Sequence, residues 1–189
     1  MKISSGLFWG TILAWSVADL AGLWLGGITA GELNQALWGM DTCPDPCLIS
    51  NPVQWATVLG LCIGAWMGAA EWLCLRRLSL GWIAASMTGW AAGMAIAVSL
   101  DAEVPGLYGL VVGTLVGLMQ WVVLRRLVQA SGWWIAASAA AAFISGLGFV
   151  QPGFSIAALA YAPFTFYGTG FVFGLIRGVT MVLLIRKWS

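Results

Sequence analysis

Long apolar stretches separated by short polar segments dominate the pattern of this chain. A helix that crosses a bilayer needs about 20 apolar residues. Lipid offers no hydrogen-bond partners to a backbone, so such stretches form helices. The pattern therefore predicts an all-α integral membrane protein. Its six transmembrane helices are expected at about 6–29, 53–75, 81–100, 105–124, 132–150 and 165–185.

Composition supports this prediction. The 189 residues are 61% hydrophobic and 8% charged, and the mean hydropathy is +0.93. A soluble domain carries about 25% charged residues, so the bilayer is the expected solvent. No stretch is long enough for a separate soluble domain. The chain is therefore predicted to form a single transmembrane domain over residues 1–189.

A pattern of glycines and basic residues occurs three times along the chain. Three glycines stand four residues apart in an apolar stretch, and a basic pair begins eight residues after the last glycine. The pattern predicts three repeated helical hairpins, over about 6–75, 81–125 and 132–187. The glycines are Gly60, Gly64, Gly68, Gly109, Gly113, Gly117, Gly170, Gly174 and Gly178, and the pairs are Arg76–Arg77, Arg125–Arg126 and Arg186–Lys187.

The glycines are predicted to mark the packed face of each returning helix. Small residues at every fourth position let two helix backbones approach closely in lipid. We expect the glycine stripes to pack on alanine faces of the outgoing helices, around a pseudo-threefold axis. The candidate alanines are Ala84, Ala85, Ala91, Ala92 and those between Ala136 and Ala142.

Charge predicts the orientation. Seven of the eight Lys and Arg residues fall on one side of the predicted spans. Basic residues in short loops stay cytoplasmic, so both termini are predicted inside. The basic pairs are interpreted as topology anchors, with anionic lipid headgroups or a cytoplasmic partner as the alternative. A net charge of +1 provides no large basic face, which argues against nucleic acid as a partner.

The chain has thirteen tryptophans. Those near predicted span ends are interpreted as anchors in the headgroup region, which suits the indole ring. The deeper ones are interpreted as packing or lipid contacts, or alternatively as flat walls for a planar or lipidic ligand. The residues near span ends are Trp9, Trp38, Trp55, Trp82, Trp133, Trp134 and Trp188.

Three ionisable residues, Asp19, Glu71 and Arg177, fall inside predicted spans, together with the polar Gln120. A charge at the bilayer centre costs about 3 kcal/mol or more unless it is paired. Glu71 and Gln120 stand on the glycine face, three residues after the last glycine of their repeats, where the third repeat has Met181. We predict that the four polar residues form a buried cluster. It would act either as a static ion pair or as an ion, proton or anionic-solute site.

Other chemistry is sparse. The chain has no histidine, the usual general base and the commonest metal ligand, and no nucleophile–base pair can be assembled. We therefore expect neither an enzyme nor a metal site. Cys43 and Cys47 stand in a predicted outer loop, where a local disulfide is expected. A free redox pair or a metal site is the alternative.

One unit of the pattern carries a resemblance. It consists of Gly117, Gln120, Trp121, Leu124 and Arg125, followed by Trp133-Trp134. The unit resembles a group of uncharacterised bacterial multipass membrane proteins with repeated Gly-x-x-Gln-Trp-x-x-Leu-Arg transmembrane hairpins. The match covers mainly residues 60–146. The first repeat has Glu71 instead of glutamine, and the third lacks both glutamine and tryptophan. The resemblance implies the fold alone, and no activity.

These features predict a non-enzymatic membrane protein in a bacterial inner or thylakoid-type membrane. It would be an accessory or interaction subunit of a membrane complex, or a module that binds lipid or pigment. The expected partners are the bilayer and other membrane chains. Without histidine, pigment ligation would fall to Glu71, Gln120, carbonyls or water. The alternative is a small-solute or ion transporter or channel component that uses the buried cluster, although the repeats are parallel rather than inverted.

Overall fold

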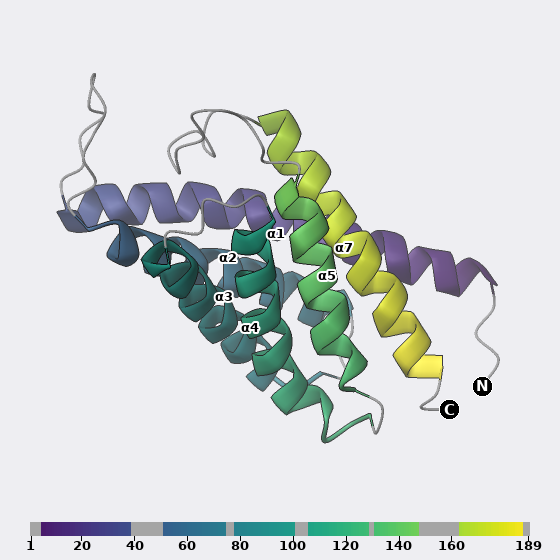
Figure 1. Ribbon diagram of the computed structural model, residues 1–189. Coiled ribbons are helices and arrows are strands. Elements are labelled where there is room, and N and C mark those ends of the chain that lie inside the picture. Colours follow the sequence, from purple (N-terminus) through teal and green to yellow (C-terminus); the bar gives the residue numbers. More distant parts are fainter. Residues whose placement is uncertain are drawn as a thin grey trace.

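All secondary-structure elements in the described part of the chain are helices, and it contains no strand. The computed structural model describes residues 5–38, 51–74, 78–100, 106–128, 131–147 and 163–186. Figure 1 shows how the helices are arranged. They are α1 (Ser5–Trp38), α2 (Pro52–Cys74), α3 (Gly81–Ser99), α4 (Leu107–Leu124), α5 (Trp133–Leu147) and α7 (Pro163–Arg186).

Four helices are long and apolar enough to cross a membrane. They contain the segments Trp9–Leu37, Pro52–Cys74, Gly81–Ser99 and Leu107–Leu124. The remaining apolar segments, Trp133–Leu147 and Gly170–Ile185, are shorter. The four long segments indicate a membrane protein. The crossings by α5 and α7 stay predictions from the sequence.

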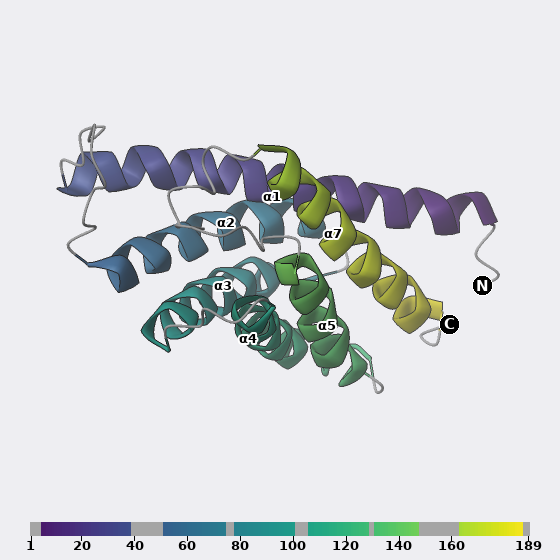
Figure 2. The same cartoon turned by 45° about the horizontal axis from the view of Figure 1, so that its top comes forward.

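Helix α1 is longer than the sequence pattern predicts. We expected it to end near residue 29 and a connection to follow, but it continues to Trp38. Its 34 residues span about 51 Å at 1.5 Å per residue, more than the bilayer hydrocarbon of about 30 Å. Along the extension, Asn34 Nδ2 donates to the Ala30 carbonyl at 2.9 Å, whereas Asn34 Oδ1 is buried without a partner among the described residues. Figure 2 shows α1 extending past its neighbours.

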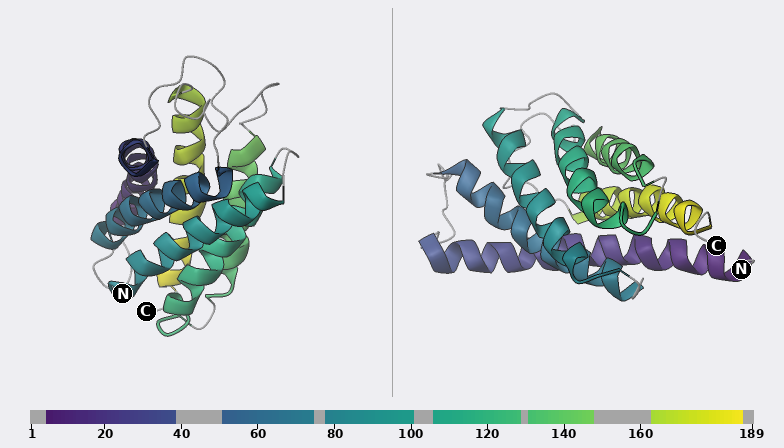
Figure 3. Two further views of the ribbon diagram at one scale, coloured as in Figure 1. Left: turned by 90° about the vertical axis from the view of Figure 1, so that its left-hand side faces the viewer. Right: turned by 90° about the horizontal axis from the view of Figure 1, so that it is seen from below.

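The six helices form a closed ring around one interior. Going around it, α1 packs on α2, α2 on α3, α3 on α4, α4 on α5, α5 on α7, and α7 on α1. The two views in Figure 3 show how the helices are arranged, and in the right-hand view the start of α1 and the end of α7 lie on the same side. Side chains from all six helices can therefore meet inside the ring.

The predicted glycines lie at the closest helix contacts. A Cβ added at Gly60 would lie 2.6 Å from the Trp90 carbonyl oxygen on α3, and one at Gly174 would lie 2.6 Å from the Ser16 Cα on α1. A Cβ at Gly109 would overlap the Ala142 carbonyl on α5. The predicted glycines thus bring α2 close to α3, α4 close to α5 and α7 close to α1.

The contact surface is only in part the alanine face that we expected, since Ala91 and Ala142 lie at the contacts with Gly60 and Gly109. Ala84 is exposed, and serines contribute at the corresponding places. Cβ atoms at Gly64 and Gly113 would meet the carbonyl oxygens of Ser86 and Ser138, respectively. Serine is small enough for the same close approach, so side-chain size decides these contacts.

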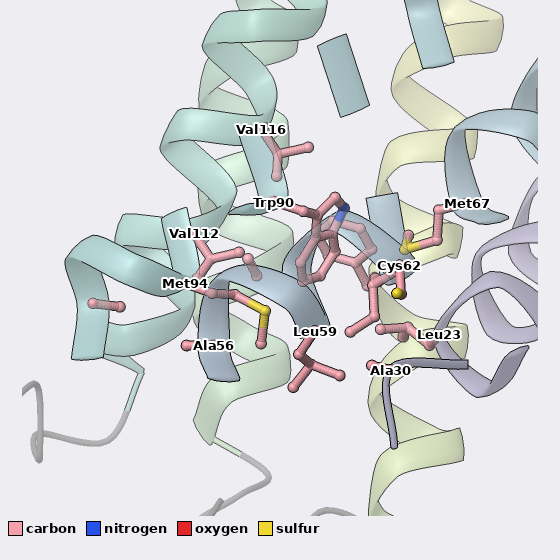
Figure 4. Close-up of a cluster of buried hydrophobic side chains, with 14 of the residues drawn as sticks. Leu23, Ala30, Ala56, Leu59, Cys62, Met67, Trp90, Met94, Val112 and Val116 are labelled. Carbon is pink, nitrogen blue, oxygen red and sulfur yellow. The ribbon is translucent and has the colours of Figure 1, made fainter. Parts of the chain in front are cut away.

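Two groups of buried apolar side chains fill the interior. The larger one, here the apolar core, draws on α1 to α5 and α7 and includes Ile63, Met67, Trp90, Val116 and Phe173; Figure 4 shows part of it. The smaller one, here the tryptophan cap, joins the first parts of α1, α3 and α5 to the last parts of α4 and α7. It consists of Trp15, Leu78, Trp82, Leu124, Val128, Trp134, Met181 and Leu184.

Candidate functional site

The structure brings together the four polar residues that the sequence singled out. Arg177 of α7 lies among the other three. Its Nη1 is 2.6 Å from Glu71 Oε1 and 3.2 Å from Asp19 Oδ2, and its Nη2 donates to Gln120 Oε1 at 2.6 Å. None of the four is more than 1% exposed. They are called the polar cluster below.

Further hydrogen bonds connect the cluster to α3. Gln120 Nε2 donates to Ser86 Oγ at 2.8 Å and to Glu71 Oε2 at 3.2 Å. Trp82 Nε1 donates to the same Glu71 oxygen at 2.7 Å. The network therefore joins residues of α1, α2, α3, α4 and α7 through the interior of the ring.

Three tryptophans lie together beside the cluster. The ring centroids of Trp15, Trp82 and Trp134 are 5.7 to 6.3 Å apart, and none of the three is exposed to solvent. Trp134 Nε1 donates to Gln120 Oε1 at 3.0 Å. The predicted headgroup role is therefore wrong for Trp82 and Trp134. Both indoles are core residues with buried hydrogen bonds, whereas the neighbouring Trp133 is 71% exposed.

The spacing of tryptophans and polar residues in the sequence is a signal for this triad. Each of its tryptophans stands four residues before a buried polar residue on the same helix. Residues four apart share a helix face, so tryptophan and polar side chain point into the interior together. The pairs are Trp15 and Asp19, Trp82 and Ser86, and Trp134 and Ser138.

The structure also corrects the register of the third glycine pattern. A Cβ at Gly68 would contact the first and the fourth residue after Trp82, which are Ile83 and Ser86. A Cβ at Gly174 would contact the first and the fourth residue after Trp15, which are Ser16 and Asp19. Gly174 is therefore the counterpart of Gly68.

The residue three positions after each of these glycines is Glu71 or Arg177, and after Gly117 it is Gln120. Arg177, not Met181, thus occupies the place of Glu71 and Gln120. Met181 belongs to the tryptophan cap. Gly178 extends the four-residue spacing by one further turn. The sequence pattern alone therefore placed the third repeat one turn too far along α7.

Aromatic rings also stabilise the Arg177 guanidinium. Its Cζ lies 4.7 Å from the ring centroid of Phe173 and 4.9 Å from that of Trp134. A cation over an aromatic ring is attracted by the negative face of the ring, most strongly where water is excluded. Phe173 belongs to the apolar core and Trp134 to the cap, so the arginine links the two apolar groups.

Of the other predicted site residues, Arg125 and Arg126 follow the end of α4 and are exposed. The Arg125 guanidinium lies 5.2 Å from the Trp121 ring. Arg186 ends α7, but its side chain lies outside the described residues, as do Arg76, Arg77, Lys187, Cys43 and Cys47. Whether the last two form a disulfide stays a prediction. Cys62 and Cys74 of α2 are free.

The geometry limits what the polar cluster can do. The Glu71 carboxylate already accepts hydrogen bonds from Trp82 and Gln120 and pairs with Arg177, and it is fully buried. A pigment could use Glu71 as a ligand only by breaking this network. Within the described segments, no group of three or more acidic or cysteine side chains could hold a metal ion.

No family model, no curated protein and no solved structure matches the chain. The resemblance noted from the sequence stays a prediction.

Proposed function

We propose that this chain is a non-enzymatic membrane module whose interior is structural and whose outer surface binds lipid, a hydrophobic ligand or another membrane chain. The observation that carries this proposal is the complete burial of Asp19, Glu71, Gln120 and Arg177. A hydrated path for ions or solutes exposes its polar side chains to water. These side chains instead bond to one another.

Apolar groups enclose the cluster on two sides. The cap tryptophans Trp82 and Trp134 bond directly to it, and Phe173 of the apolar core stacks on Arg177. A charged side chain inside a membrane is costly unless paired, and here the pairing joins four helices. We infer that the cluster fixes the relative positions of the helices in the ring.

The proposed orientation places the tryptophan cap toward the cytoplasm. The exposed Arg125 and Arg126 lie between two cap residues, Leu124 and Val128. Basic residues stay cytoplasmic, so this end would face inward, and the helices would cross as three hairpins with both termini inside.

The outer surface supplies the proposed binding function. Large apolar side chains point outward along the ring, among them Trp24, which is 49% exposed, and Trp66, which is 43% exposed. Trp66 Nε1 donates to Thr29 Oγ1 of α1 at 3.0 Å. This hydrogen bond fixes the orientation of the Trp66 indole on the outer surface of the helices. Rigid aromatic surfaces are typical anchors for partners in an apolar solvent.

The test is to purify the protein gently in lipid nanodiscs and to identify the mass that co-purifies with it. Trp24→Leu and Trp15→Leu form a matched pair on α1, one outward and one inward. The proposal predicts that W24L lowers the bound mass with an unchanged unfolding midpoint, and that W15L lowers the midpoint. A wild-type protein that carries nothing beyond bulk lipid would contradict the proposed binding function.

A second function, an ion or solute transport component, is favoured by one observation. Asp19 Oδ1 and Arg177 Nε are buried without a hydrogen-bond partner in the described part of the chain. Transport predicts solute flux in liposomes that Arg177→Leu abolishes. The structural role predicts no flux from either protein.

A further inference from the structure

We propose that Asp19 and Glu71 hold a single proton between them, and that this proton makes the polar cluster electrically neutral inside the membrane. The proposal concerns the charge state of the interior. It stands whether the outer surface binds lipid, ligand or protein.

The first argument is charge balance. The cluster contains two carboxyl groups and one guanidinium, all fully buried. Helices α3, α4 and α5, which complete its surroundings, have no charged residue between their first and last residues. The nearby titratable group is Cys74, whose thiol donates to the Ala14 carbonyl oxygen. With both carboxyl groups ionised, the interior would hold one uncompensated negative charge, which a membrane disfavours strongly.

The second argument is geometric. Asp19 Oδ2 and Glu71 Oε1 both contact the same Arg177 nitrogen, at 3.2 and 2.6 Å. Two like charges that share one site do not both ionise. The proton belongs to the pair.

The contacts around the pair indicate which carboxyl group carries the proton. Glu71 Oε2 accepts hydrogen bonds from Trp82 and Gln120, and each such bond favours the ionised form. Glu71 Oε1 is 2.6 Å from Arg177 Nη1, the shorter of the two ion-pair contacts. Asp19 accepts one hydrogen bond, from Arg177 Nη1 to its Oδ2. We therefore place the proton on Asp19, with Glu71 as the ionised partner of Arg177.

The internal comparison of the three tryptophans explains why a proton is needed here. Trp82 faces the acceptor Glu71 and Trp134 faces the acceptor Gln120. The corresponding partner of Trp15 is Arg177, which is also a donor, and Trp15 Nε1 is buried without a partner. Placing a donor at this position leaves a surplus of acceptors at Asp19 and Glu71. A proton converts one of these acceptors into a donor.

The experiment uses infrared spectroscopy of the full chain in lipid nanodiscs at neutral pH, together with the yield of folded protein. We expect the wild type to show a protonated-carboxyl C=O band that D19N removes. D19N should keep the wild-type folded yield, because an amide is isosteric with the protonated acid. The matched control, Glu32→Gln, changes an exposed carboxyl group of the same helix and should leave the band in place.

Two further variants keep the test decisive. E71Q forces Asp19 to become the ionised partner, so we expect the band to disappear and the folded yield to fall below that of D19N. The double variant D19N/E71Q leaves Arg177 without a counter-charge and should lose yield several-fold relative to either single variant.

Three results would overturn the proposal. They are the absence of the band in the wild type, its persistence in D19N, and a D19N yield as low as that of the double variant. Replacement of sodium and potassium by choline should not change the unfolding midpoint. A loss of stability that occurs in the wild type but not in D19N would show that a metal cation, not a proton, occupies the site.

Discussion

The polar cluster and the apolar core lie side by side within the same ring of helices, and they hold it together in different ways. In the apolar core, glycines let helices approach so closely that a Cβ at Gly64 would lie 2.6 Å from the Met87 Cα. In the polar cluster, Arg177 joins side chains of three other helices. The stability of the apolar core thus depends on how well its side chains and backbones fit together. The stability of the polar cluster depends on the presence of every partner.

This difference predicts unequal responses to substitution. A packed apolar contact loses free energy in proportion to the atoms removed or crowded. A buried ionic network instead loses most when one partner is removed and the others stay, because the remaining charge is stranded.

The largest effect is expected for Arg177→Leu. The substitution strands two buried carboxyl groups, and breaking a buried pair costs about 3–5 kcal/mol of unfolding free energy. Detergent-induced unfolding measures this loss. The matched control is Arg126→Leu, which removes an exposed arginine. Equal stability of the two variants would show that the cluster contributes nothing to folding.

The next effect separates two members of the tryptophan triad. Trp82→Phe removes a hydrogen bond to the ionised Glu71, and a bond to a charged group contributes about 1.5–3 kcal/mol. Trp15→Phe removes a ring of the same size, but Trp15 Nε1 has no partner among the described residues. W82F should therefore unfold at a lower detergent concentration than W15F. The opposite order would contradict the assigned hydrogen bonds.

The smallest effect is expected in the apolar core. Gly64→Ala places a Cβ against the backbone of α3, and overpacking costs about 1–3 kcal/mol. Gly27→Ala is the control, since no atom lies within 4 Å of its added Cβ, and alanine there should stabilise the helix by up to about 1 kcal/mol. Stability rising in both variants would exclude close packing at Gly64.

Much of this interior could be predicted from the sequence, for a physical reason. Ionisable residues are rare in apolar spans because they are costly, so Asp19, Glu71 and Arg177 stood out at once. Close glycine contacts were also predictable, because residues four apart share a helix face. The predicted helix boundaries agree with the observed ones to within about three residues except at the end of α1. The polar residues there are compatible with either a loop or a helix.

Two features were not predicted, although the polar residue four positions after each triad tryptophan is a signal for the first of them. An indole suits both a membrane interface and a buried hydrogen bond, so position near a span end did not distinguish Trp82 and Trp134 from Trp133. The register of α7 was ambiguous because Gly170, Gly174 and Gly178 repeat every turn. Only the contacts of Gly174 with α1 show that Arg177 faces the interior in the place of Glu71.

The most direct test of a closed, mutually dependent polar cluster is a double-mutant cycle between Arg177 and Glu71. Unfolding free energies are measured for the wild type, Arg177→Leu, Glu71→Leu and the double variant. We expect the double variant to be less destabilised than the sum of the single variants, with a coupling of about 0.5–3 kcal/mol. Simple additivity of the two substitutions would contradict this expectation.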